Sequence, residues 1–203
     1  MFILEAENPQ LYQYVKDQNL SRQYELLENC IEIGLLKGPL AFDKYMLWAL
    51  NHAATANLSQ FSGRFREEPV YIGDHRPPHF RDVGGHVDRY VATILENWFE
   101  WSPTELAAYA LWRLNWIHPF VDGNGRTARA VAYHLVCVRF GVSLRGAKIL
   151  PERMRENPVD YQLALRAADR AWEVGLLDFS EMEEYLAAHL QAQLQNDGFP
   201  GPA

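Results

Sequence analysis

A polar stretch between two apolar runs is the strongest constraint on how this chain folds. Residues 117–129 contain an imidazole, a carboxylate, a carboxamide, two glycines and two guanidinium groups. Apolar runs flank this stretch on both sides, at residues 106–116 and 130–140. Both runs have the pattern of helices, so the polar stretch is predicted to be a functional site held between two helices.

Apolar residues at helical spacing continue through most of the remaining chain. Ser102-Pro103-Thr104-Glu105 has the signature of a helix start, and Gly141 is predicted to end the helix that follows the polar stretch. The predicted helices cover residues 11–38, 41–58, 82–99, 103–116, 124–140, a segment that begins near 157, and 179–194. We therefore expect an all-α single domain.

One segment has the character of a β-strand rather than a helix. Val70, Tyr71 and Ile72 favour extended backbone, and Gly73-Asp74 can turn the chain back. We expect a small β-hairpin flap here. Because a lone hairpin is not stable by itself, it must lie against the helices or cover a site.

Composition and charge exclude several classes of function. Hydrophobic residues make up 48% of the chain, which is enough for a core, and the net charge of -7 without a basic cluster argues against nucleic acid as a partner. No apolar run approaches the roughly 20 residues that span a membrane. The beginning of the chain does not resemble a secretory signal, and Cys30 and Cys137 are expected to be buried thiols. We expect a cytoplasmic location.

The end of the polar stretch is suited to binding an anion. Asp122-Gly123-Asn124-Gly125-Arg126 is predicted to open a helix, whose first backbone N–H groups are unpaired and carry the positive end of the helix dipole. The two glycines remove side chains that would keep an anion away. This arrangement predicts an anion hole suited to phosphate.

The neighbouring side chains extend this hypothesis to a nucleotide polyphosphate. Arg126 and Arg129 are three residues apart on one helix face, so both can reach one polyphosphate, and the Asn124 carboxamide can donate to a phosphate oxygen. Asp122 can supply an oxygen ligand to Mg²⁺, and His118 can act as a general base. Each residue alone has an ordinary structural explanation; their combination in this order predicts a site.

At this point a known family can be recognised. The segment His118-Pro-Phe-Val-Asp122-Gly-Asn-Gly-Arg-Thr-Ala-Arg129 resembles the Fic motif H-x-F-x-[D/E]-G-N-G-R-x-x-R at every defined position. Gly63-Arg-Phe-Arg66 and residues 70–78 resemble the segment that forms the target-docking flap of that family. The likeness covers roughly residues 40–190. It implies a Fic domain at 40–195, a helical extension packed on it at 1–39, and a disordered tail at 196–203.

The resemblance implies a protein adenylyltransferase, which transfers AMP from Mg-ATP to a Ser, Thr or Tyr hydroxyl of a target protein. His118 would be the catalytic base, Asp122 would hold Mg²⁺, and Arg129 would take the γ-phosphate. The target would dock on the flap at residues 70–78. The other residues implied to contact the nucleotide are Gly123, Asn124, Gly125, Arg126, Ile72, Gly73, Asp74, His75 and Tyr161, with Asp169 nearby.

Regulation and the exact reaction stay open at the level of sequence. Many Fic proteins carry an inhibitory helix, [S/T]-x-x-x-E-[G/N], and the near-matches here are incomplete at Glu25, Glu28 and Glu184. We favour a toxin-like member controlled by a separate antitoxin protein, against an enzyme without this control or one inhibited by Glu184. The alternative functions are use of another nucleotide, removal of AMP, or a catalytically silent antitoxin-binding module.

Overall fold

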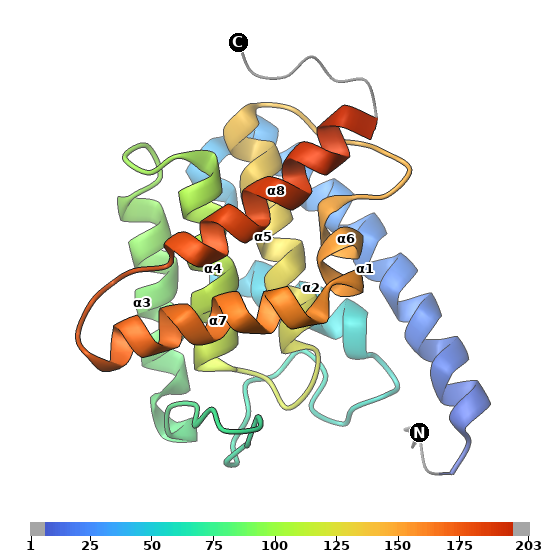
Figure 1. Cartoon of the computed structure of the whole chain (residues 1–203). Helices are drawn as coiled ribbons and strands as arrows, with labels where there is room; N and C mark the ends of the chain where they lie inside the picture. The colour runs from blue at the N-terminus through green and yellow to red at the C-terminus, as the bar shows by residue number, and fades with distance from the viewer. Residues whose placement is uncertain (1–6, 197–203) are drawn as a thin grey trace.

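The structure, a computed structural model, describes residues 7–196 and consists of helices, with a long connection between Thr55 and Phe80 that contains the flap segment (Figure 1). Two single turns of 3-10 helix, Gly38–Ala41 and Phe80–Asp82, precede the second and third α-helices. The α-helices are α1 Pro9–Lys37, α2 Lys44–Thr55, α3 Val83–Glu96, α4 Pro103–Ile117, α5 Asn124–Phe140, α6 Leu150–Glu156, α7 Pro158–Glu173 and α8 Ser180–Asn196. The predicted all-α fold is confirmed.

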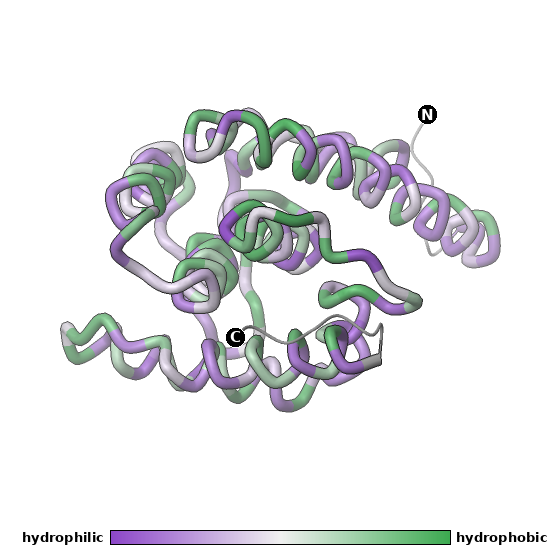
Figure 2. The backbone as a smooth tube through the Cα atoms, turned by 90° about the horizontal axis from the view of Figure 1, so that it is seen from above, coloured by the Kyte–Doolittle hydropathy of each residue, from purple (hydrophilic) through white to green (hydrophobic). Residues whose placement is uncertain are grey.

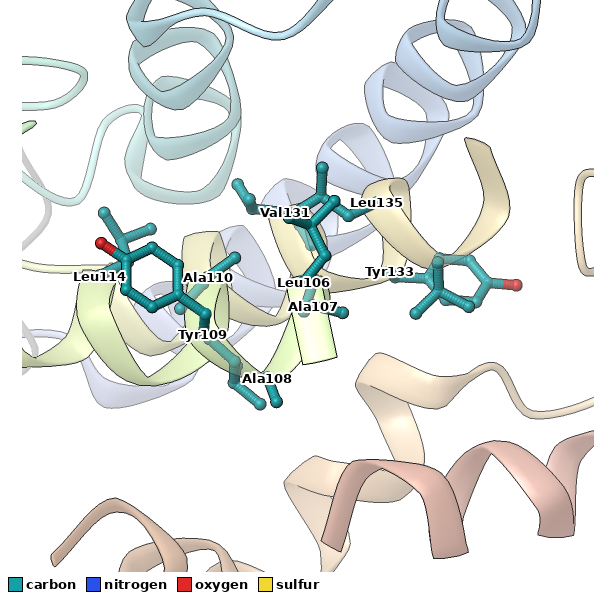
Figure 3. Packing of buried hydrophobic residues seen from close by; sticks show 14 of the residues in the cluster. Leu106, Ala107, Ala108, Tyr109, Ala110, Leu114, Val131, Tyr133 and Leu135 are labelled. Atoms are coloured by element: carbon teal, nitrogen blue, oxygen red, sulfur yellow. The ribbon is translucent and has the colours of Figure 1, made fainter. Parts of the chain in front are cut away.

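Helices α4 and α5 form the centre of the molecule. The side chains of α4 from Leu106 to Leu114 are buried, as are most of those of α5, and the two helices pack closely along their length. Figure 3 shows labelled members of this core from both helices. Because the motif loop, residues 118–123, joins α4 to α5, the packing of this pair fixes the two ends of the loop.

The outer helices cover the central pair from several sides. Helix α1 packs on α2 and α5, α3 packs on α4, and α7 and α8 cross α4 on another side (Figure 1). Green and purple alternate along the outer helices in Figure 2, as expected for helices with one buried and one solvated face. No helix in the described part of the chain is long and apolar enough to cross a membrane.

The flap, residues 70–78, has less β-structure than predicted. One antiparallel bridge joins Ile72 to His75 around the turn at Gly73, and no longer strand pair forms in this described segment. Pro69, Pro77 and Pro78 flank the turn, and proline cannot donate to a ladder of hydrogen bonds. The turn at Gly73-Asp74 lies where it was predicted, and the pairing of the predicted small hairpin is limited to this one bridge.

Two predictions about the ends of the chain have different outcomes. The N-terminal helix begins at Pro9, where the Asn8 side chain accepts from the Leu11 N–H at 3.0 Å. Helix α1 packs on α2 and α5. The predicted boundary at residue 39 between an N-terminal extension and the Fic domain stays a prediction. Of the predicted tail, residues 197–203 lie outside the described residues.

A buried histidine gives the fold a specific dependence on pH. His134 of α5 is fully buried, and neither ring nitrogen has a hydrogen-bond partner among the described residues. Burial lowers the pKa of His134 to about 4, against about 6.5 in an unfolded chain. The unfolded state therefore takes up this proton first, and stability falls as the pH drops from about 6.5 towards 4.

Replacing His134 with leucine should remove this part of the acid sensitivity. Between pH 7 and pH 5 the free energy of unfolding of the wild type should fall by about 2 kcal/mol through His134 alone, from the linkage relation. Urea unfolding at both pH values measures the loss. His134→Leu should show a loss smaller by this amount, and the exposed His79→Gln should behave like the wild type. Equal losses in all three proteins would contradict the assignment.

Candidate active site at the α4–α5 loop

The motif loop reverses the chain between the two central helices by means of two left-handed residues. His118 ends α4 with φ of 48° and ψ of 60°, and Gly123 precedes α5 with φ of 81°. A non-glycine residue in this conformation is uncommon and is held by its surroundings. Phe120 is fully buried between these two residues and anchors the loop in the core.

The Asn124 side chain closes the loop. It is 2% exposed; its Oδ1 accepts from the Phe120 N–H at 2.9 Å, and its Nδ2 donates to the Phe120 carbonyl at 2.8 Å. Both halves of the carboxamide are therefore used within the loop. One of the two N–H donors of Nδ2 is used in this way, so donation from the carboxamide to a phosphate stays a prediction, and the backbone N–H of Asn124 is a second donor for an anion.

Exchanging Asn124 for aspartate should test this structural role. The substitution would place a carboxylate oxygen against the Phe120 carbonyl in place of a donor, so two acceptors would meet in a buried site. We expect a loss of about 3 kcal/mol in the free energy of unfolding, measured by urea denaturation. An unchanged midpoint would show that the carboxamide does not close the loop.

A buried asparagine from α2 holds the other side of the loop. Asn51 Nδ2 donates to the Asp122 carbonyl at 2.8 Å, and its Oδ1 accepts from the Gly63 N–H at 3.0 Å. The same Nδ2 lies 3.3 Å from the Thr127 hydroxyl of α5. Asn51 was not predicted as a site residue, because a single asparagine in a helix usually faces solvent. It connects the loop to the segment that leads into the flap.

A cleft of about 550 Å³, here called the anion cleft, lies over the start of α5. The motif contributes His118, Asp122, Gly123, Asn124, Gly125, Arg126 and Arg129 to its lining. The sequence prediction that these residues share one site is consistent with this placement. The opposite wall, which was not predicted, comes from α1 and α6 and contains Gln13, Lys16, Asp17, Leu20, Gln23, Tyr24, Pro151 and Arg155.

Within the anion cleft, the two arginines of the motif have different partners. Arg126 Nη2 lies 2.9 Å from Asp122 Oδ2, and Arg126 Nη1 donates to the Ala54 carbonyl. The Arg129 guanidinium lies 6.0 Å from the centre of the Tyr161 ring and has no ion-pair partner within the described residues. Arg129 is therefore the cation that is less engaged by the protein and more available to a ligand.

The Asp122 carboxylate fits a role in holding Mg²⁺. Its side chain is 44% exposed in the cleft, and Oδ1 accepts from the Gly123 N–H at 2.6 Å while Oδ2 pairs with Arg126. Mg²⁺ is commonly held by one or two carboxylates, substrate phosphates and waters. No group of three or more His, Cys, Asp or Glu that could hold a metal by itself occurs in the described part of the chain. One accessible carboxylate beside an anion cleft suits this mode of binding.

His118 is held as a neutral imidazole with one nitrogen available. Its Nδ1 lies 3.3 Å from the Asn115 carbonyl, which can only accept, so Nδ1 carries the proton and Nε2 keeps its lone pair. Burial lowers the pKa of His118 to about 4, an effect that the hydrogen bond to Asn115 partly opposes. The ring is thus unprotonated at neutral pH, as a proton acceptor must be.

A second cleft, the flap cleft, meets the anion cleft at His118. It has a volume of about 640 Å³ and lies between the flap turn and α7. Ile72, Gly73, Asp74 and His75 line it together with His118, Asn115, Trp116, Gln162, Leu165 and residues of α7 up to Glu173. His75 Nε2 donates to the Trp116 carbonyl at 2.9 Å, which fixes the flap turn to the end of α4.

Asp169 lines a cleft, whereas Tyr161 is buried behind the cleft walls. Asp169 lines the flap cleft and accepts from Trp112 Nε1 at 2.8 Å. Tyr161 is buried, its hydroxyl accepts from Asn115 Nδ2 at 2.8 Å, and it is in the lining of neither cleft. The structure therefore places Tyr161 behind Arg129 and Asn115, as a support for both.

The glutamates of the incomplete inhibitory motifs do not face the anion cleft. Among the described residues, neither Glu25 nor Glu184 lines either cleft, and Glu28 lines a separate, smaller cavity between α1 and the loop after α5. Tyr24 of α1 lies close enough to Arg155 and Arg129 for their charges to lower the pKa of its hydroxyl, although burial raises that pKa overall. Autoinhibition by Glu184 has no support in this arrangement.

Comparisons with known proteins agree with this site. The family model described as "Fic/DOC family" matches residues 41–136. "Protein adenylyltransferase Fic" of Drosophila persimilis is 43% identical over 68 residues, which cover 33% of this chain and 13% of that protein. The protein of the same name from Nematostella vectensis is 41% identical over 69 residues, covering 34% of this chain and 16% of its own length. The matched segments are thus a small part of these longer relatives.

Solved structures share the fold over most of the chain. "Fic-1" from C. elegans has a TM-score of 0.68 at 24% identity, covering 89% of this chain and 49% of that one. A Fic domain containing signaling protein from Bacteroides thetaiotaomicron has a TM-score of 0.69 at 21% identity, covering 89% and 71% respectively. At these identities the likeness shows the fold. The family match over residues 41–136, which includes the motif loop, identifies a Fic/DOC domain in this chain.

Proposed function

We propose that this chain is a protein adenylyltransferase that transfers AMP from Mg-ATP to a hydroxyl side chain of a target protein. The observation that carries the proposal is the position of His118, a neutral imidazole with a free Nε2 where the anion cleft and the flap cleft meet. The relatives named protein adenylyltransferase support the same class of reaction.

The anion cleft supplies the binding site for the polyphosphate. The first backbone N–H groups of α5 point into it without intrahelical acceptors, and the helix dipole adds positive potential there. Arg129 would neutralise the terminal phosphate. Asp122 would hold Mg²⁺, which when bound offsets the charge of the phosphates and of the leaving pyrophosphate.

His118 would act on the acceptor hydroxyl. Nε2 takes the hydroxyl proton while the oxygen attacks the α-phosphorus; the bond from the α-phosphorus to the bridging oxygen breaks, and pyrophosphate leaves. The low pKa of His118 belongs to the protein without nucleotide. The negative charge of a bound triphosphate would raise this pKa towards neutrality and so strengthen the base.

The flap cleft would bind the nucleoside of ATP and the backbone of the target protein. Ile72, Gly73, Asp74 and His75 border it, so we propose that they contact the nucleoside, as the motif resemblance implies. The target would add its backbone to the flap at residues 70–78, where Tyr71 is exposed and the bridge is limited to one residue pair. Both clefts would then deliver their ligands to one imidazole.

A panel of nucleotides distinguishes this function from the alternatives within the same fold. The protein would be incubated with Mg²⁺, a cell extract as a source of acceptors, and either ATP or UTP labelled at the α-phosphorus. Protein labelling from ATP alone, absent with His118→Ala, is the expected result. Labelling from UTP alone would reject the AMP assignment, and no labelling with any nucleotide would favour a catalytically silent binding module.

We further propose that a separate small antitoxin protein controls the activity of this chain. The supporting observation is that none of the motif-related glutamates Glu25, Glu28 and Glu184 lines the cleft beside Arg129. A partner carrying the [S/T]-x-x-x-E-[G/N] sequence should suppress labelling when mixed with the protein, and its Glu→Gly variant should not. Equal labelling with and without the partner would reject this mode of control.

A further inference from the structure

Arg66 is a buried arginine whose hydrogen-bonding partners are all backbone carbonyls. It is 2% exposed, and Nε donates to the His118 carbonyl at 2.8 Å while Nη2 donates to the Pro78 carbonyl at 2.6 Å. Longer contacts reach the carbonyls of Ile117 at 3.4 Å and Glu68 at 3.3 Å. No carboxylate pairs with it among the described residues.

These four carbonyls belong to two parts of the site. Ile117 and His118 are the last residues of α4 and its C-cap, where helix carbonyls lack intrahelical donors and carry partial negative charge. Glu68 lies just before the flap, and Pro78 is its last residue. One guanidinium therefore binds the backbone of the catalytic histidine, the segment that leads into the flap and the end of the flap.

The backbone around Arg66 strengthens the same connection. The Arg66 N–H donates to the Pro119 carbonyl at 2.8 Å, and Phe65 forms an antiparallel bridge with Phe120. The rings of Phe65 and Phe120 are 5.6 Å apart. The connection from α2 to the flap thus runs along the motif loop, at the end of the bundle where the teal and yellow-green segments meet in Figure 1.

The chemistry of this position requires arginine. A buried charge is costly unless its hydrogen-bonding capacity is satisfied, and here carbonyl dipoles balance it. Lysine carries the same charge as a compact ammonium, but it lacks the planar fork that reaches several fixed acceptors. The pKa of His118 is lowered mainly by burial and then by the nearby His75. The positive charge of Arg66 lowers it further and so helps to keep the imidazole unprotonated.

We propose that Arg66 is the positioning residue that couples the flap to His118, so that one buried side chain sets both where the acceptor docks and where the base points. This inference rests on the proposed function. Nucleotide binding should be largely independent of Arg66, because Asn51 and Asn124 hold the anion-binding part of the loop by separate contacts.

The test compares Arg66→Lys and Arg66→Met with Arg89→Lys, at an exposed arginine of α3, as a matched control. AMP transfer would be measured as kcat and as KM for ATP, with the melting temperature recorded for each protein. Arg66→Lys should lower kcat by about 100-fold, since an ångström-scale misplacement of a catalytic group has an effect of this size. KM for ATP should change less than about threefold, and Arg89→Lys should match the wild type.

A readout that needs no activity separates this proposal from the proposed function. The ring of His118 would be titrated by NMR in the wild type and the variants. In Arg66→Met its pKa should rise relative to the wild type, because a nearby positive charge is lost, and in Arg66→Lys it should stay closer to the wild-type value. If the wild type transfers no AMP, the proposed function fails while this titration still tests the contact.

Two results would overturn the role of Arg66. Wild-type kcat in a folded Arg66→Lys would show that the carbonyl contacts do not position the base. A loss confined to KM for ATP would assign Arg66 to nucleotide binding instead. If Arg66→Met does not fold, Arg66→Lys, which keeps the charge, decides the kinetic part.

Discussion

Replacing His118 with alanine should lower the rate of AMP transfer by about 10²–10⁴-fold, the usual contribution of a general base. The imidazole is the one residue shared by the linings of the anion cleft and the flap cleft in the described part of the chain. Its removal takes away the proton acceptor but leaves the helix start, Arg126 and Arg129 in place. ATP affinity should therefore change little, and initial rates together with calorimetric titration of ATP measure the two quantities.

The matched control for this substitution is His79→Ala, which removes an exposed imidazole that directly follows the flap in the chain. It should keep the wild-type rate. Should His118→Ala retain more than a tenth of the wild-type rate while His79→Ala is unaffected, His118 is not the base. A large loss of ATP affinity in His118→Ala would instead show that the residue serves mainly in binding.

Gly123→Ala should abolish nucleotide binding by displacing the loop over the anion cleft. A Cβ at residue 123 would lie 2.7 Å from Thr55 Cγ2 and 2.8 Å from Asn51 Nδ2, and the φ of 81° is strained for any side chain. Both partners belong to the buried side of α2 and cannot move away easily. The backbone must shift, and the N–H groups at the start of α5 shift with it.

A second glycine provides the control for Gly123→Ala. A Cβ at Gly84 in α3 would meet nothing within 4 Å, and its φ is not positive. Gly84→Ala should therefore leave ATP binding unchanged and raise the free energy of unfolding by about 0.4–1 kcal/mol. Calorimetric titration with Mg-ATP and urea unfolding measure both effects. Normal ATP binding by Gly123→Ala would contradict the account of the anion cleft.

The sequence predicts those parts of the fold that local chemistry determines. Helix α5 begins at Asn124 and ends at Phe140 as predicted, because left-handed glycines flank it at both ends. Ser102 caps α4 in the predicted way, with Glu105 completing a capping box. The motif residues from His118 to Arg129 are close in sequence, so their grouping around one cleft could also be predicted from their spacing.

Features that depend on distant contacts could not be predicted. Helix α6 was missed because it has seven residues and its N-cap position is Ile149, although Pro151-Glu152 repeats the proline-and-acid signal seen at α4. The hairpin predicted at residues 70–78 has a single bridge, because extended propensity at Val70 and Ile72 does not ensure further pairing beside three prolines. Helix α1 lines the anion cleft with polar residues such as Lys16 and Asp17, which resemble an ordinary solvated face.

Buried polar residues were the hardest part of the site to predict. Asn51 and Arg66 are of types that usually face solvent, and the motif-loop carbonyls that they bind are more than 50 residues away in the chain. The Asn124 side chain was assigned to phosphate because its position in the motif suits a donor. Only the structure shows that both its polar atoms are bound to Phe120. Tertiary hydrogen bonds therefore add structural roles that local order does not suggest.

The most direct test of the central claim is the source of the label that reaches protein. The wild type would be incubated with Mg²⁺, a cell extract, and ATP labelled either at the α-phosphorus or at the γ-phosphorus, and protein-bound label would be counted. AMP transfer at His118 predicts label from the α-phosphorus alone, at a level that falls by at least 10²-fold with His118→Ala. Label from the γ-phosphorus alone, or equal α-label in the wild type and His118→Ala, would contradict it.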